Sequence, residues 1–215
     1  MIEDPRTFIL RHTRPQAPPH APELTLYLAD DSTPLWRLGE TELAEMGLEA
    51  PFWAFAWAGG QGLARYLLDH PHEARGRTVI DFAAGSAIAA IAAMTAGAAQ
   101  ALAADIDAFC AAAVALNAEA NGVTMAFTDA DLLEAEPPAV DVVCAGDIAY
   151  EAPLAARVRA WLKRARDRGA RVLIGDPHRT YFDPAGLVQL AEYRVPTTRE
   201  LEDLAVKRTG VWTFA

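Results

Sequence analysis

The spacing of apolar residues changes several times along this chain, and each change predicts a switch between a strand and a helix. Short apolar runs predict strands at residues 77–82, 100–105, 123–129, 140–147 and 169–177. Apolar residues at helical spacing between these runs predict helices at residues 86–96, 107–121 and 153–168, and the tail, residues 204–215, suits a last strand. Strands that alternate with helices predict an α/β fold with a mostly parallel sheet.

The N-terminal part of the chain has a less regular pattern. Residues 23–30 and 33–38 suit the two strands of a short hairpin. Residues 52–68 suit an amphipathic helix that glycines at positions 59, 60 and 62 would interrupt. The 215 residues are enough for one domain with a full core. We therefore predict an N-terminal extension, residues 1–50, followed by the main domain, residues 51–215.

The longest uncharged stretch, residues 82–104, has the length of a membrane-spanning helix. It consists mostly of Ala and Gly, which contribute little to membrane insertion, and Gly97 lies where a helix would end. We therefore interpret it as a strand end, a buried helix, a turn and the next strand, and we expect no membrane partner. The segment MIEDPRTFIL lacks the apolar core of a secretory signal, so we expect a cytoplasmic protein.

Charge and composition argue against several classes of partner. The formal net charge is −10, whereas a nucleic-acid surface needs clustered Lys and Arg to replace counterions, so we expect no nucleic acid. The five histidines are scattered, and Cys110 and Cys144 lie in Ala-rich and Val-rich surroundings that are typical of buried thiols. No metal site is indicated. The charge is compatible with a protein substrate or a small cationic one.

Acidic residues follow the predicted strands. Asp81 and Asp105 end the first two strands, Asp131 follows the third, and Asp147 ends the fourth. Ligand sites in open parallel sheets lie beyond the carboxyl ends of the strands, so these four residues are expected at one site. Asp is also common in turns and helix caps, which weakens the signal from any one of them. The four together predict a functional site.

The turn after the first strand reads DFAAGSA, with one glycine where dinucleotide-binding turns carry three. The Asp81 carboxylate would be unfavourable beside a pyrophosphate, and the methyl groups of Ala83 and Ala87 would crowd it. S-adenosylmethionine has no phosphate, and its methionine half carries an ammonium group that an acidic residue attracts. Its ribose diol suits Asp105, which lies 20 residues after Gly85. The turn therefore favours S-adenosylmethionine over NAD as the cofactor.

Several stretches of the chain resemble class I S-adenosylmethionine-dependent methyltransferases, namely DFAAGSA, AADID, NAEANGV and DVVCAGDIAYE. A narrower resemblance, to the protein-lysine methyltransferases that act on the electron-transfer-flavoprotein β-subunit, rests on PFWAFAWAGGQGLARYLL, DIAY, LIGDPHRTYF and VPTTRELED. It covers roughly residue 51 to the C-terminus. The resemblance implies a Rossmann-like seven-stranded sheet whose last strand inserts antiparallel. It also implies a protein-lysine N-methyltransferase whose partner is the electron-transfer-flavoprotein β-subunit or a similar protein.

The same resemblance implies a set of cofactor contacts. In chain order they are Trp57 beside the cofactor, Asp81 and Gly85 in the first turn, Asp105 and Ile106 at the ribose and adenine, Asp131 near the adenine edge, and Ala145 in the pocket lining. The chain departs from the family pattern at Ala83 and Ala87, where glycines are common. Each replacement adds one methyl group, so we expect the packing of the turn to adjust.

Asp147 and Tyr150 match the D-x-x-Y substrate motif of that family. A lysine amine has a reference pKa of about 10.4, so only about 10⁻³ to 10⁻⁴ of it is the free nucleophile at neutral pH. A carboxylate can orient the ammonium form, and a tyrosine can offer its ring face or its hydroxyl. Because a carboxylate also raises the pKa of a nearby amine, we assign Asp147 to binding and orientation. Water and the carboxylate both remain candidate proton acceptors.

Two other functions fit the same residues. An acidic and an aromatic residue after the fourth strand also resemble the arrangement by which amino-group methyltransferases hold a flipped base, and a small-molecule amine is another candidate acceptor. The net charge and the absence of a Pro-Pro pair from the motif argue against a nucleic acid. The glycine-poor turn is compatible with an inactive relative that binds its ligand without methylating it.

Overall fold

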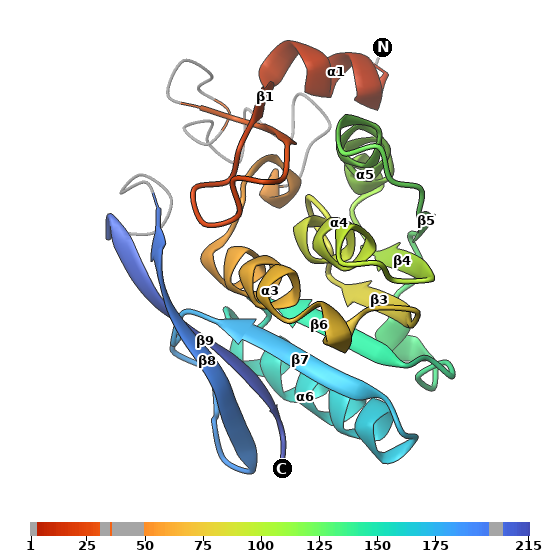
Figure 1. Ribbon diagram of the computed structural model, residues 1–215, viewed down its shortest axis with the longest axis vertical. Helices are drawn as coiled ribbons and strands as arrows, with labels where there is room; N and C mark the ends of the chain where they lie inside the picture. The colour runs from red at the N-terminus through yellow and green to blue at the C-terminus, as the bar shows by residue number, and fades with distance from the viewer. Residues whose placement is uncertain (1–3, 31–34, 36–49, 198–203) are drawn as a thin grey trace.

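The computed structural model describes residues 4–30, 35, 50–197 and 204–215. Its main feature is a seven-stranded sheet with the strand order β5-β4-β3-β6-β7-β9-β8 (Figure 1). The strands are β3 (Thr78–Phe82), β4 (Gln100–Ala104), β5 (Ala126–Thr128), β6 (Val142–Gly146), β7 (Arg171–Asp176), β8 (Leu187–Pro196) and β9 (Val206–Phe214). Neighbouring strands are parallel from β5 to β7, and β9 lies antiparallel between β7 and β8. The predicted fold class, with its antiparallel last strand, is confirmed.

Helices cover both faces of the sheet. One face carries α3 (Ala58–Asp69), α4 (Ile88–Thr95) and α5 (Ala108–Ala120), and the other carries α6 (Ala152–Asp167) (Figure 1). Short 3₁₀ helices lie between these elements, namely η2 (Phe52–Ala54), η3 (Pro71–Glu73) and η4 (Leu132–Glu134). Leu173 of β7 packs in the core beneath α3, whereas Val143 of β6 packs in the core against α6. Burial on both faces explains why the central strands are apolar at nearly every position.

The segment predicted as one helix, residues 52–68, is interrupted before α3. Trp57 is extended and precedes the helix, which begins only at Ala58. The glycines expected to break the helix lie inside it, where they allow close packing. A Cβ atom on Gly59 would lie 2.3 Å from the carbonyl oxygen of Gly175 in β7. The prediction of a single interrupted helix was therefore wrong, because these glycines permit close approach to the sheet and do not end the helix.

The apolar pattern did not predict β8. This strand forms an edge of the sheet, and nearly all of its side chains are exposed or half-buried. An edge strand that carries several polar residues gives only a weak periodic signal. Residues 198–203, which carry most of the VPTTRELED resemblance, lie outside the described residues.

The N-terminal residues form a helix and a small sheet. The helix α1 (Pro5–His12) packs near α5, and β1 (Arg14–Gln16) pairs antiparallel with β2 (Leu26–Leu28). The strand predicted around β2 is present, but its partner is the upstream β1. The predicted partner, residues 33–38, lies outside the described residues except for Leu35. The domain boundary at residue 50 stays a prediction.

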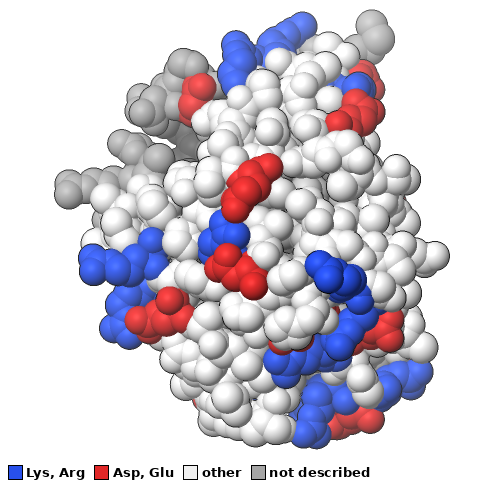
Figure 2. Space-filling model, in the orientation of Figure 1, with Lys and Arg blue, Asp and Glu red and all other residues white. Residues whose placement is uncertain are grey.

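The basic residues of α6 face solvent and have acidic partners. Arg157 lies 2.8 Å from Glu134, and Lys163 lies 2.7 Å from Asp167. Figure 2 shows Lys and Arg interleaved with Asp and Glu on the visible face, without a continuous surface of one sign. The basic residues of α6 therefore form a solvated helix face whose charges are partly compensated by neighbouring acids.

Two structural features are absent from the residues described above. Within them, no helix combines the length and apolar character that a bilayer span requires. The same residues contain no cluster of three or more His, Cys, Asp and Glu side chains placed to hold a metal ion. Cys110 and Cys144 are free and buried, and burial raises the pKa of both thiols.

Candidate active site

Most of the predicted site residues lie at the carboxyl ends of the parallel strands β3, β4 and β6. We call residues 81–87 and 105–107, at the carboxyl ends of β3 and β4, the cofactor edge. We call residues 147–150 and 176–179, at the carboxyl ends of β6 and β7, the acceptor edge. The strands β3 and β6 are hydrogen-bonded neighbours, so the two edges adjoin.

Asp81 lies near the end of β3 and supports the first turn from within the protein. Its buried Oδ2 accepts the N–H of Ala90, in the first turn of α4, at 2.9 Å. A carboxylate at this end of a helix satisfies an otherwise unpaired amide and complements the helix dipole. Burial raises the pKa of the Asp81 carboxyl to about 7, against the lowering effect of the helix amides. Its direct contact with a cofactor stays a prediction.

Asp105 ties the first turn to the neighbouring strand. Its Oδ2 accepts the N–H of Gly85 at 2.8 Å, and its Oδ1 accepts the N–H of Asp107 at 3.0 Å. A carboxylate oxygen can accept a second hydrogen bond, so the group can also bind the two hydroxyls of a ribose. The next residue, Ile106, is 70% exposed and offers an apolar surface on which an adenine ring can lie.

Two alanines of the cofactor edge have left-handed backbone conformations. The φ angle is +52° at Ala83 and +60° at Ala87. These are the two positions where glycines are common in the family that the chain resembles. A left-handed conformation costs a residue with a Cβ atom roughly 1–2 kcal/mol. The departures at these positions therefore strain the backbone, in addition to the packing adjustment that we expected.

The residues of the cofactor edge fit S-adenosylmethionine. They provide a carboxylate for the ribose, an apolar surface for the base, and a turn without the glycines and the positive charge that a pyrophosphate requires. Asp131 is exposed and caps η4 through the N–H of Leu133 at 2.9 Å. Ala145 is fully buried in the core on the α6 side of the sheet. The cofactor contacts predicted for Asp131 and Ala145 stay predictions.

Asp147 is the central residue of the acceptor edge. It follows β6 with a left-handed φ of +56°, a conformation that often marks functional positions. Its Oδ2 accepts the N–H of Gly60, in the first turn of α3, at 2.9 Å, and its Oδ1 accepts two N–H groups of Arg179 at 2.7 and 3.2 Å. Burial raises the pKa of the Asp147 carboxyl, whereas the Arg179 guanidinium and the α3 amides lower it.

Two residues of the acceptor edge, Asp176 and Arg179, were not among the predicted site residues. Asp176 ends β7 and is fully buried, and its Oδ1 accepts the backbone N–H of Arg179 at 2.8 Å. Its Oδ2 has no hydrogen-bond partner among the described residues. Burial raises the pKa of Asp176 to about 7, and the nearby Asp147 adds to this effect. The sequence pattern could have identified Asp176, because it lies at the end of a predicted strand, as Asp81 and Asp147 do.

A row of three aromatic rings, those of Tyr150, Phe52 and Trp57, reaches the Asp147–Arg179 pair at Arg179. Tyr150 is 52% exposed, and its ring lies 6.0 Å from that of Phe52, which in turn lies 5.7 Å from that of Trp57. The Arg179 guanidinium lies 5.8 Å from the centre of the Trp57 ring. The structure thus brings three predicted residues, Trp57, Asp147 and Tyr150, into one region. A carboxylate among aromatic faces suits a cationic side chain.

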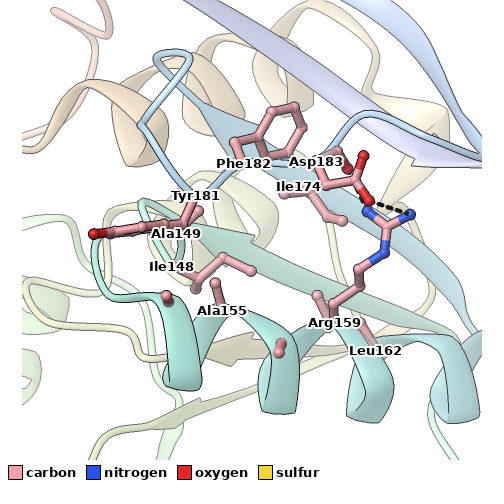
Figure 3. Close-up of a pocket in the computed structure, with 11 residues that line it drawn as sticks. Ile148, Ala149, Ala155, Arg159, Leu162, Ile174, Tyr181, Phe182 and Asp183 are labelled. Atoms are coloured by element: carbon pink, nitrogen blue, oxygen red, sulfur yellow. Dashed lines mark hydrogen bonds and ion pairs between the residues drawn. The ribbon is translucent and has the colours of Figure 1, made fainter.

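An apolar pocket of about 300 Å³ adjoins the acceptor edge (Figure 3). Ile148 and Ala149, which lie within the D-x-x-Y motif, form one wall, and alanines of α6 form another. At the rim, Arg159 faces Asp183, with 3.8 Å between the closest charged atoms. The mostly apolar lining suits contact with an apolar side chain, and Tyr181 adds a phenol hydroxyl to the lining.

The chain is similar in sequence to known methyltransferases. The family model of the ribosomal protein L11 methyltransferase (PrmA) matches residues 64–167. The electron transfer flavoprotein beta subunit lysine methyltransferase of Xenopus laevis is 38% identical over 98% of this chain and 87% of its own length. The enzyme of the same name from Mus musculus is 38% identical over 76% of this chain and 67% of its own length.

A solved structure supports the fold. The magnesium protoporphyrin IX methyltransferase (ChlM) of Synechocystis PCC 6803, with S-adenosylmethionine (SAM) bound, superposes with a TM-score of 0.53. The superposition covers 73% of this chain and 78% of that chain, at 16% sequence identity. At that identity the likeness concerns the fold, and the closer sequence relatives are the evidence for the chemistry.

Proposed function

This chain belongs to the electron transfer flavoprotein beta subunit lysine methyltransferase family, and from that premise we propose that it methylates a lysine of an electron-transfer-flavoprotein β-subunit. It is an S-adenosylmethionine-dependent methyltransferase of protein lysines, as its relatives are named and as the cofactor edge fits. The identity of the substrate protein is the proposed part. It is supported by the names of the relatives, which match most of the chain.

The observation that carries the proposal is the Asp147–Arg179 pair beside the cofactor edge, with the row of aromatic rings that reaches it at Arg179. A lysine side chain is a long apolar stem with a cationic end, so it can lie along Phe52 and Tyr150 while its ammonium reaches the carboxylate. Asp147 is held by α3 and by Arg179, and this fixes its direction. A rigid acceptor residue favours the in-line alignment on which methyl transfer depends.

The chemistry assigns separate tasks to the two edges. S-adenosylmethionine supplies the methyl group as an electrophile. The lysine nitrogen must first lose one proton, and it then forms the new bond to the methyl carbon while the electron pair of the carbon–sulfur bond stays with sulfur. On this proposal Asp105 and Ile106 position the cofactor, and Asp147 and Tyr150 position the nitrogen. These residue roles are proposals supported by the geometry described above.

The experiment that tests the proposal uses methyl-labelled S-adenosylmethionine and a cell lysate that contains the electron-transfer flavoprotein. After incubation with the purified protein, one portion is treated with protease and another with nuclease. The proposal expects label in a band of the size of the β-subunit that protease alone removes. Label removed by nuclease would favour methylation of a nucleic acid, and cofactor binding without any labelled product would favour an inactive relative.

We also propose a cytoplasmic location for the protein. The two free buried thiols, Cys110 and Cys144, are compatible with a reducing compartment. Fractionation of cells that express the full chain tests this proposal, which expects the protein in the soluble cytoplasmic fraction.

A further inference from the structure

The Asp147 carboxylate already has a cationic partner in the structure. Arg179 donates two hydrogen bonds to Oδ1, and the side chains of Arg179 and Asp147 are only 21% and 11% exposed. An ion pair that is this well shielded interacts more strongly than one on an open surface. A substrate lysine must therefore bind to a carboxylate whose charge is largely compensated.

This compensation bears directly on the chemistry of the acceptor. A lone carboxylate would stabilise the ammonium form of the lysine, which has no electron pair to donate. A guanidinium beside it has the opposite effect, because it repels a second positive charge. Arg179 is suited to this task, since a guanidinium keeps its proton throughout the pH range in which an enzyme works.

We propose that Arg179 stays paired with Asp147 when the substrate lysine binds, and that its positive charge favours the neutral, nucleophilic form of the lysine amine. This inference rests on the proposed function, because it concerns the lysine acceptor. Arg179 thus acts as a positioning and charge-compensating residue. The proton leaves the ammonium for water, the nitrogen electron pair forms the bond to the methyl carbon, and the electrons of the broken carbon–sulfur bond remain on sulfur.

Several contacts hold Arg179 in place. Its backbone N–H binds Asp176, and its guanidinium lies over the Trp57 ring. The preceding residue, His178, has a left-handed φ of +61°, so the chain turns sharply after β7. A side chain held by a buried carboxylate, an aromatic ring and a strained turn is fixed in position before any substrate arrives.

The other charged groups near the pair are mostly acidic. Asp176 and His178 lie on the turn after β7, while Asp105 and Glu151 act on Tyr150. The raised pKa of Asp176, due to burial, keeps much of that carboxyl neutral near pH 7. Among the described residues that act on Asp147, Arg179 is the charged side chain that opposes the stabilisation of a substrate cation, and the backbone amides of Gly59 and Gly60 act in the same direction.

The test is the pH dependence of kcat, which reports ionisations in the enzyme–substrate complex. Arg179→Gln removes the charge, and the acid limb of the profile should move to higher pH by about one unit. At a pH below the limb, kcat should then fall about tenfold. Arg179→Lys is the matched control, since it keeps the charge and should keep the limb at the wild-type pH, whatever its absolute turnover. Cofactor affinity should stay unchanged in both variants.

If the Arg179→Gln variant does not fold, Arg179→Met serves as the neutral variant, because it keeps an apolar stem over Trp57. An unmoved acid limb in the folded neutral variant would overturn the inference. A lower KM of that variant together with an unmoved acid limb would also overturn the inference, because it would show that the lysine displaces Arg179 from Asp147. Failure of the wild-type protein to methylate any lysine would refute the proposed function instead, and the two failures are therefore distinguishable.

Discussion

The two edges of the site use the same residue type in different ways. At the cofactor edge, Asp81 and Asp105 bind backbone amides, those of α4 and of the first turn. At the acceptor edge, Asp147 binds one helix amide and the guanidinium of Arg179. Both edges contain left-handed residues that are not glycine, and at the acceptor edge the Asp147 carboxylate forms an ion pair with the Arg179 side chain.

This difference follows from what each edge must recognise. A cofactor is the same in every turnover, so carboxylates fixed by backbone amides provide a rigid frame for it. A lysine arrives with a proton that it must lose, so its site has to bind a cation without holding it in that form. We infer that the cofactor edge is built for rigidity and the acceptor edge for balanced charge.

The largest expected effect concerns stability and the buried Asp176. Its folded-state pKa, about 7, lies above its ordinary value of 3.8, so its protonated form stabilises the fold at low pH. That stability is lost as pH rises from about 4 to about 7. Asp176→Asn removes this titration. The free energy of unfolding of the variant, minus that of the wild-type protein, should therefore rise across this pH window by up to roughly 4 kcal/mol. Urea unfolding at several pH values measures it.

Asp141→Asn is the control for this titration. Hydrogen bonds from Thr78 lower the pKa of Asp141, so this variant should gain no stability relative to wild type as pH rises. Asp81→Asn should follow the trend of Asp176→Asn, since burial raises the Asp81 pKa to about 7 as well. An Asp176→Asn profile parallel to that of the wild-type protein would show that the carboxyl is not buried in the way described.

Asp147→Asn should separate the two edges in function. The amide oxygen still accepts the Gly60 N–H, so the cofactor affinity should be nearly intact, whereas the amide NH₂ faces the Arg179 guanidinium and the fold should lose some stability. The lost charge-assisted contact is worth about 1.5–3 kcal/mol, which corresponds to a fall in turnover of about tenfold to a hundredfold. Methyl-transfer rates together with calorimetric cofactor titrations measure this. Lost cofactor binding with retained methylation of a free-amine peptide would move Asp147 out of the acceptor edge.

Asp105→Ala should show the converse pattern. It removes the predicted acceptor of the ribose and a partner of the Gly85 N–H, so cofactor binding should weaken by about 1–3 kcal/mol. Calorimetry with S-adenosylmethionine, with NAD as the comparison ligand, measures the change. Unchanged affinity would remove Asp105 from the cofactor edge, and a preference of the wild-type protein for NAD would refute the charge argument about the first turn.

The smallest expected effect concerns the strained alanines. Ala83 is exposed, so Ala83→Gly should relieve the left-handed strain and stabilise the fold by up to about 1 kcal/mol. Ala87 is fully buried, so Ala87→Gly also loses a packed methyl group and should change stability little. Thermal unfolding of both variants makes the comparison. Equal stabilisation of the two would show that strain, without any packing contribution, sets the cost.

The sequence predicted the frame of the site because that frame depends on local patterns. Continuous apolar runs identified the central strands, and the residue after each strand identified Asp81, Asp105 and Asp147. The edge strand β8 escaped detection because it buries too few side chains to show a period. The Asp147–Arg179 pair joins residues 32 positions apart, and the Gly59 contact joins α3 to β7, so both depend on tertiary packing that no local pattern contains.

The central claim is that the acceptor edge presents a protein lysine to the methyl donor. It is tested most directly by incubating the purified protein and S-adenosylmethionine with purified electron-transfer-flavoprotein β-subunit, followed by peptide mass spectrometry. The account predicts methyl groups on one or more lysine side chains of the β-subunit, and an initial rate of methylation lower by about tenfold to a hundredfold when Asp147→Asn replaces the wild-type protein. A β-subunit without methyl groups, despite demonstrated binding of the cofactor, would contradict it.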